Sequence, residues 1–170
     1  MSSNYYITTP IYYVNDVPHI GHAYTTLACD VIARFKRLDG FNVFFLTGTD
    51  EHGQKVELAA KNKGVAPKEF VDEVSKNFRS LLECMNFSND DFIRTTEKRH
   101  LDSCKKIWKK LLENGSIYLD KYSGWYSVRD EAFYSETEII DGTAPSGAPV
   151  EWVEEPSYFF NLSKWEDKLL

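Results

Sequence analysis

The sequence lacks long hydrophobic runs and has few cysteines. Its longest strictly apolar run spans residues 43–46, far short of the roughly 20 apolar residues that a membrane-spanning helix needs. It contains only 3 cysteines and no CxxC pair, which excludes a disulfide framework. We therefore expect Cys29, Cys84 and Cys104 to be reduced and mostly buried. No Lys or Arg precedes Arg34, so the sequence predicts no basic signal or transit peptide and a cytoplasmic protein.

A strong excess of charge is also lacking. The 170 residues are 42% hydrophobic and 27% charged, which is ordinary for a globular chain and excludes collagen-like and disordered chains. The net charge of -6 disfavours a protein that holds nucleic acid by bulk electrostatics alone, although it leaves room for a local basic face. The length corresponds to about one domain.

The start of the chain has the pattern of a βαβ unit. Residues 4–9 are rich in β-forming side chains and end at Pro10, which cannot continue a central strand. Over residues 24–38 the apolar positions recur at the spacing of one helix face, and Gly40 follows as a stop. Residues 42–46 are typical of a short buried strand. This order predicts two parallel strands joined by a right-handed crossover.

The loop between the first strand and its helix is unusually long. It runs from Pro10 to near Gly21, whereas βα loops usually take about 2–6 residues. In open α/β sheets, ligands bind at the carboxyl ends of the strands. We therefore expect the functional site in this loop.

Further helices and a β-rich lobe are predicted beyond this unit. Helices are expected over residues 54–62, from Pro67 onward and over residues 97–112. The last of them is expected to bury Leu101, Cys104, Ile107 (or Trp108), Leu111 and Leu112. Over residues 116–160, aromatic, glycine and proline residues predict short antiparallel strands, which indicates a domain boundary near residue 115.

Two histidines flank a glycine where the long loop meets the helix. Free N–H groups and the positive dipole end make a helix N-terminus a site for phosphate. His19 and His22 can donate hydrogen bonds to phosphate oxygens there, and Gly21 permits a close approach to the backbone. The alternative is that both histidines are only surface or capping residues.

A second polar cluster, TGTDEHG at residues 47–53, follows the predicted second strand. Strand ends on the same sheet edge converge, so Asp50 and His52 are expected to face the same crevice as the first two histidines. An acid there can hold an ammonium group or a ribose hydroxyl. The alternative is a polar turn that caps the next helix. In the long loop, Tyr12 and Tyr13 either wall a pocket or only pack the loop.

Several strings of residues resemble the methionyl-tRNA synthetases, a family of class I aminoacyl-tRNA synthetases. They are TPIYYVN at 9–15, PHIGH at 18–22, TGTDEHG at 47–53, FIRTTE at 92–97 and GWYSVRDE at 124–131. All class I aminoacyl-tRNA synthetases and some nucleotidyltransferases share the HIGH motif, whereas TGTDEHG and TPIYYVN are much narrower. The resemblance implies an α/β fold: the first half of a Rossmann-like parallel-sheet nucleotide-binding domain, followed by the start of an inserted, mainly β connective domain. The corresponding ranges are 1–115 and 116–170.

The resemblance also implies a reaction. Methionine would react with ATP, assisted by Mg²⁺, to give methionyl-adenylate, and the methionyl group would then pass to the 3′ end of methionine tRNA. Such chemistry depends mostly on positioning and charge stabilisation.

Roles for individual residues follow from the same resemblance. His19 and His22 would be the catalytic, ATP-binding histidines, and Gly21 would lie under the adenine. Asp50 would bind the substrate ammonium group, and Ile11 with Tyr13 would form part of the methionine pocket. Further candidates for lining the substrate crevice are Tyr12, Glu51 and His52.

Two features depart from the family pattern. Many members carry a zinc knuckle, but this chain has Ser127 and Asp130 where the first cysteine pair would lie, and no thiol at residues 144–147. We therefore expect a zinc-free lobe without a structural metal. The second signature of the family, a KMSKS loop, and the anticodon-binding part are absent from the 170 residues. We expect these residues to need the remaining C-terminal polypeptide and to be inactive alone.

Two other functions stay open at the level of sequence. A small HxGH nucleotidyltransferase fits the length but predicts neither TGTDEHG nor an acidic insert. A non-catalytic module that binds tRNA or protein is the other alternative. Its binding face would consist of Lys105, Lys106, Lys109 and Lys110, which more often form a solvated helix face.

Overall fold

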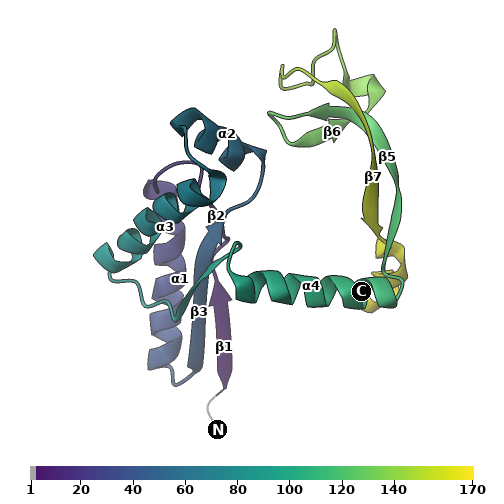
Figure 1. Ribbon diagram of the computed structural model, residues 1–170. Coiled ribbons are helices and arrows are strands. Elements are labelled where there is room, and N and C mark those ends of the chain that lie inside the picture. The colour runs from purple at the N-terminus through teal and green to yellow at the C-terminus, as the bar shows by residue number, and fades with distance from the viewer. Residues whose placement is uncertain (1–2) are drawn as a thin grey trace. The chain divides into compact units, whose positions relative to one another are not determined.

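The computed structural model describes residues 3–170, which form two compact units (Figure 1). The first unit ends at Cys104 and the second is Lys105–Leu170, so the division falls within the continuous helix α4 (Lys98–Glu113). A domain boundary near residue 115 stays a prediction. Within residues 3–170, no helix has the length and apolar character needed to cross a membrane.

A parallel sheet forms the centre of the first unit. Its strands are β1 (Asn4–Thr8), β2 (Tyr12–Tyr13), β3 (Asn42–Asp50) and β4 (Asp91–Arg94). The inner strand is β3, because Thr49 pairs with Tyr12 on one edge and with Arg94 on the other. All pairings are parallel, and helix α1 (Ile20–Leu38) connects β1 to β3. The predicted βαβ unit is confirmed.

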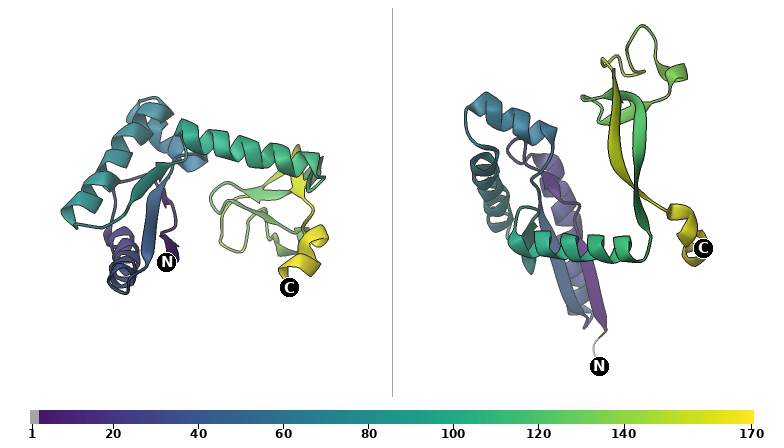
Figure 2. Two further views of the ribbon diagram at one scale, coloured as in Figure 1. Left: turned by 90° about the horizontal axis from the view of Figure 1, so that it is seen from below. Right: turned by 45° about the vertical axis from the view of Figure 1, so that its right-hand side comes forward.

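Two helices of this unit cover one face of the sheet. From β1 to β3 to β4 the chain steps twice in the same direction, and right-handed crossovers then place both connections on the same side. Figure 2 shows α1 and α3 (Pro67–Cys84) on that common side. Helix α2 (Gln54–Lys63) precedes α3 and ends at Gly64, whose φ of 73° suits glycine. The helices predicted over 54–62 and from Pro67 are confirmed.

The core of the unit lies between α3 and the strand ends. The buried cluster includes Val14, Val56, Phe70, Val71, Val74, Phe78, Leu82 and Phe92. Tyr12, from the long loop, belongs to the same cluster and is only 8% exposed. The loop is therefore anchored to the core at its centre.

Strand β3 is longer than predicted, because it continues through the polar residues that follow Leu46. Thr47 and Thr49 are buried, and the hydroxyl of Thr47 forms a hydrogen bond of 2.7 Å with that of Thr9. A Cβ at Gly48 would lie 2.0 Å from the carbonyl oxygen of Ile93, so only glycine permits β3 and β4 to approach this closely. The strand extends to Asp50 because the Thr47 hydroxyl is paired in the interior and because Gly48 has no side chain.

The orientation of α1 differs from the one that its apolar pattern suggests. Tyr24 and Leu38, on the predicted buried face, are 74% and 88% exposed, whereas Asp30 is buried. The carboxylate of Asp30 accepts hydrogen bonds from the backbone N–H and the hydroxyl of Ser88, at 2.7 and 2.6 Å, and from Arg34 at 2.6 Å. A polar contact to the segment before β4 therefore sets which side of the helix faces inward.

The predicted burial of α4 and of the cysteines is wrong. None of the residues of α4 is buried, and Leu101, Ile107 and Leu112 are 38%, 60% and 39% exposed. Cys84 and Cys104 are exposed and only Cys29 is partly buried, because the helix faces that carry the first two are not covered by residues 3–170.

The second unit contains an antiparallel sheet and three short helical turns, one between its last two strands and two after the sheet. Its strands β5 (Ile117–Ser127), β6 (Ala132–Tyr134) and β7 (Glu151–Phe160) have the order β6-β5-β7, and β5 lies beside β7 along its length (Figure 2). The turns are η1 (Glu136–Glu138), η2 (Leu162–Trp165) and α5 (Glu166–Leu169). The predicted change to β structure after residue 115 is confirmed.

A hydrogen-bonded cluster occupies the place where the family pattern has a zinc knuckle. The backbone N–H of Asp130 donates to the buried Ser127 hydroxyl at 3.2 Å, and its carboxylate accepts from Ser146 and, at 3.0 Å, from Tyr134. The hydrogen bond from Ser146 is the main cause of the lowered pKa of Asp130. Over residues 3–170, no three His, Cys, Asp or Glu side chains converge as metal ligands.

Candidate active site

The long loop and the end of β3 meet at the carboxyl edge of the sheet. Tyr12 pairs with Thr49 and Tyr13 pairs with Asp50, so the loop continues as an extra short strand beside β3. Helix α1 then begins at Ile20, directly after His19. The structure thus brings the loop against Asp50 and places the histidine motif at a helix N-terminus. That Asp50 and His52 face the same crevice as the histidines stays a prediction.

The two histidines form a reciprocal capping box. The Nδ1 atom of His19 accepts a hydrogen bond from the backbone N–H of Gly21 at 3.1 Å. The Nδ1 atom of His22 accepts one from the backbone N–H of His19 at 3.0 Å. An acceptor Nδ1 carries no proton, so each neutral imidazole keeps its hydrogen on Nε2. The motif therefore caps the helix and still offers two Nε2–H donors, so both alternatives raised by the sequence apply.

Aromatic rings hold His22 from two sides. The ring centroids of Tyr12 and Phe78 lie 4.9 and 5.2 Å from that of His22, both nearly perpendicular to it. The Tyr12 hydroxyl forms a hydrogen bond of 2.9 Å with Thr26, and burial raises the pKa of Tyr12. The pKa of His22 is lowered by burial and then by the neighbouring His19. Tyr12 thus packs against His22 and contributes to the burial that favours its neutral form.

A cavity of about 410 Å³ lies beside the histidines. Its lining residues are Ile11, Tyr12, Tyr13, Asn15, Asp16, Val17, His19 and His22. Ile11 and Tyr13 are 42% and 55% exposed, so apolar surface is presented next to the Nε2–H donors. The cavity is therefore lined by both apolar surface and hydrogen-bond donors.

Gly21 is needed for the placement of His19. A Cβ at residue 21 would lie 2.9 Å from Cε1 of His19, so any side chain would displace the imidazole ring. The backbone at Gly21 is helical, and the constraint is one of space rather than of conformation.

Asp50, at the end of β3, is half-buried. Within residues 3–170, its carboxylate forms neither a hydrogen bond nor an ion pair, so it is free to bind a cation. His52 is exposed, and its Nε2 lies 3.4 Å from the carbonyl oxygen of Thr95. Asp50 and His52, on either side of Glu51, are therefore both more exposed than Glu51.

Glu51 itself lies in the interior. Its side chain is 0% exposed, and its carboxylate accepts hydrogen bonds from Arg94, Thr49 and Thr96. These bonds occupy both carboxylate oxygens. No role for Arg94 follows from the sequence alone. The available signal is the string FIRTTE at residues 92–97, which is among those that resemble the family.

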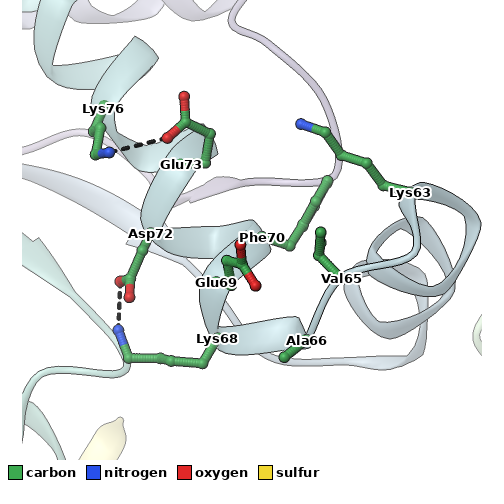
Figure 3. A pocket seen from close by; sticks show the side chains of 9 residues that line it. All are labelled: Lys63, Val65, Ala66, Lys68, Glu69, Phe70, Asp72, Glu73 and Lys76. Carbon is green, nitrogen blue, oxygen red and sulfur yellow. Dashed lines mark hydrogen bonds and ion pairs between the residues drawn. The ribbon is translucent and has the colours of Figure 1, made fainter.

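A second hollow, of about 820 Å³, lies at the start of α3 (Figure 3). Its lining residues are Lys63, Val65, Ala66, Lys68, Glu69, Phe70, Asp72, Glu73 and Lys76. The charges largely pair with one another, since Lys68 binds Asp72, and Lys76 lies 2.9 Å from Glu73. It shares no lining residue with the histidine cavity. The candidate active site is therefore the smaller cavity.

Comparison with known proteins identifies relatives of this chain. Residues 5–149 match the family of class I tRNA synthetases (M). The methionine–tRNA ligase of Rickettsia felis is 69% identical over 171 residues, covering 100% of this chain and 33% of that protein. The corresponding ligase of Mesorhizobium japonicum is 58% identical, covering 98% of this chain and 33% of that protein. This chain therefore spans about a third of the length of the curated relatives that it matches.

A solved structure matches the fold closely. Mycobacterium tuberculosis methionyl-tRNA synthetase in complex with methionyl-adenylate superposes with a TM-score of 0.88 and 51% sequence identity. The match covers 98% of this chain and 34% of that one. The predicted Rossmann-like α/β fold is confirmed, and so is the resemblance that the sequence motifs indicate.

Proposed function

Since this chain belongs to the family of class I tRNA synthetases (M), we propose that it forms the N-terminal part of a methionine–tRNA ligase. Such an enzyme activates methionine with ATP to methionyl-adenylate and transfers the methionyl group to the 3′ end of methionine tRNA. The observation that carries this proposal is the pair of Nε2–H donors at the N-terminus of α1, beside an apolar cavity and near the carboxyl end of β3.

The histidines act on the phosphate side of the reaction. A carboxylate oxygen of methionine attacks the α-phosphorus of ATP, and pyrophosphate leaves with Mg²⁺. Negative charge grows on the phosphate oxygens in the transition state, so His19 and His22 stabilise it through Nε2–H. The positive end of the α1 dipole adds to this stabilisation, because the helix begins directly after His19. Gly21 keeps His19 in place and lies under the adenine.

Asp50 and the apolar wall act on the methionine side. The free carboxylate of Asp50 binds the ammonium group, and Ile11 with Tyr13 contacts the thioether side chain. His52 lines the outer part of the crevice. Holding both reactants in one orientation removes much of the entropic barrier to attack.

The proposal also includes the domain organisation, the cellular compartment and the need for the rest of the polypeptide. Residues 1–115 form the first half of the catalytic domain, and residues 116–170 begin an inserted connective domain of the zinc-free type. The enzyme works in the cytoplasm on ATP–Mg²⁺, methionine and tRNA. Residues 1–170 alone are inactive, because the remaining polypeptide supplies the rest of the pocket.

Pyrophosphate exchange on the complete polypeptide tests this function. Labelled pyrophosphate should enter ATP only when methionine is present, and leucine or valine should support at least about 100-fold less exchange. Exchange that needs no amino acid would favour a compact nucleotidyltransferase instead. Absence of exchange together with tRNA binding would favour a non-catalytic module.

A further inference from the structure

Glu51 and Arg94 form a buried, bidentate ion pair next to Asp50. Nε and Nη2 of Arg94 lie 2.6 and 2.9 Å from the two carboxylate oxygens of Glu51. Thr49 and Thr96 donate further hydrogen bonds to these oxygens, at 2.7 and 2.5 Å. Side-chain exposure is 0% for Glu51 and 16% for Arg94, so water does not compete for these contacts.

The pair ties the turn after β3 to two other elements. The backbone N–H of Glu51 donates a hydrogen bond of 2.9 Å to the hydroxyl oxygen of Thr95, directly after β4. Arg94 also binds Asp72 of α3 at 2.5 Å. The backbone that carries Asp50 is therefore fixed from β4 and α3, although the Asp50 side chain has no such support of its own within residues 3–170.

The pair also controls charge around Asp50. In the sheet register Arg94 lies opposite Thr49, one residue from Asp50. A guanidinium free to turn would neutralise Asp50 and compete with a substrate ammonium group. Both Glu51 and Asp72 engage Arg94, and Arg94 in turn neutralises Glu51. Asp50 thus keeps its negative charge available to a cation.

We propose that the Glu51–Arg94 pair is a positioning element that fixes the Asp50 carboxylate and keeps it unpaired for the ammonium group of the amino-acid substrate. This inference rests on the role proposed for Asp50. Glu51 does not touch substrate and acts through its neighbour. A merely structural ion pair would affect every ligand of the site alike, whereas this one affects only ligands that carry an ammonium group.

The test uses the complete polypeptide and two competing ligands. One is methionine, measured by its KM in pyrophosphate exchange, and the other is 4-(methylthio)butanoate, which lacks the amino group, measured by its inhibition constant. Glu51→Gln should raise the KM for methionine about 10- to 100-fold and change the inhibition constant of the analogue less than about 3-fold. Equal losses for the two ligands would overturn the positioning role.

A matched control breaks another ion pair at the opposite end of β4. Asp91 binds Nη1 and Nη2 of Arg99, and Asp91→Asn should leave the ratio of the two constants unchanged. If Glu51→Gln does not fold, Thr96→Val removes one donor to Glu51, and a smaller loss confined to methionine is expected. A Thr96→Val loss that is equal for both ligands would overturn the inference.

The outcomes separate this inference from the proposed function. If the wild-type enzyme shows no methionine-dependent exchange, both the proposed function and the positioning role are wrong. If the wild-type enzyme is active and Asp50→Asn raises the methionine KM, but Glu51→Gln leaves it unchanged, the positioning role alone is wrong.

Discussion

The Nδ1 atom of His22 accepts the backbone N–H of His19 at 3.0 Å, while the Nδ1 atom of His19 accepts that of Gly21. Each imidazole thus uses one nitrogen to begin the helix and keeps the other for a ligand. The centroids of the two rings are 3.9 Å apart, which brings the two free nitrogens to one small region. The stability of the helix start and the proposed chemistry depend on different atoms of the same side chains, so they can be separated.

Asparagine and glutamine substitutions separate these two roles. Asparagine at residue 19 or 22 can accept the same backbone hydrogen bond but lacks the Nε2–H donor. Glutamine reaches the Nε2 position with a donor but loses the cap. We expect His19→Asn and His22→Asn to lower kcat about 10²–10³-fold, with the KM for methionine little changed.

The glutamine variants should show the opposite pattern. His19→Gln and His22→Gln should retain more of kcat than the asparagine variants while losing about 1 kcal/mol of folding stability. Steady-state exchange kinetics and urea unfolding of the four proteins provide the comparison. A loss of kcat in the glutamine variants, with kcat retained in the asparagine variants, would show that the histidines only cap the helix.

The charge state of His22 sets a pH dependence. Burial, followed by the neighbouring His19, lowers the pKa of His22 below its ordinary value. As the pH falls, His22 is protonated in the unfolded chain at a higher pH than in the folded one. The contribution of neutral His22 to the free energy of unfolding is therefore complete above about pH 6.5 and is lost as the pH falls. Nuclear magnetic resonance of labelled histidine should give a His22 midpoint below the ordinary histidine value of about 6.5. A midpoint at or above that value would contradict this environment.

Removal of the Asp50 charge should act on methionine binding. Asp50→Asn leaves an ammonium group without its counter-charge, so the methionine KM should rise about 10- to 100-fold while the KM for ATP changes little. Asp16→Asn is the matched control, since it removes the same charge from the lining of the cavity. Equal effects of the two substitutions would indicate that the overall electrostatic potential of the cavity, rather than a specific contact of Asp50, binds the ammonium group.

The hydrogen-bonded cluster around Asp130 should make the second unit independent of zinc. Protein purified without chelator should contain well under one zinc per chain, and EDTA should not change its melting temperature. Asp130→Ala should lower the melting temperature, because Ser146 and Tyr134 lose their shared acceptor. Asp141→Asn, at an exposed position of the same unit, serves as the control. Stoichiometric zinc would refute the prediction.

The sequence predicts the order of elements better than it predicts their burial. Periodicity, Gly40 and Pro67 are local signals, and they identify the helices and parallel strands correctly. The inward face of α1 depends on the contact between Asp30 and Ser88, which are 58 residues apart, so no local pattern reveals it. The extension of β3 likewise depends on Ile93 lying against Gly48.

The same distinction applies to the site. His19, His22 and Asp50 are recognisable because each follows a strand or begins a helix, where the topology of an open α/β sheet exposes residues to ligands. Glu51 has the same place in the sequence, yet it turns inward because Arg94 and Thr96 complete its hydrogen bonds. Its partners are more than 40 residues away, as the separations of 43 and 45 show, and only the fold brings them together.

Formation of methionyl-adenylate tests the central claim most directly. The complete polypeptide is mixed with methionine and ATP labelled at the α-phosphorus, and the bound product is quantified in a single turnover. We predict close to one methionyl-adenylate per active site for the wild type and a rate at least about 100-fold lower for His22→Asn. Absence of the adenylate from the wild type, or formation at an unchanged rate in His22→Asn, would contradict the account.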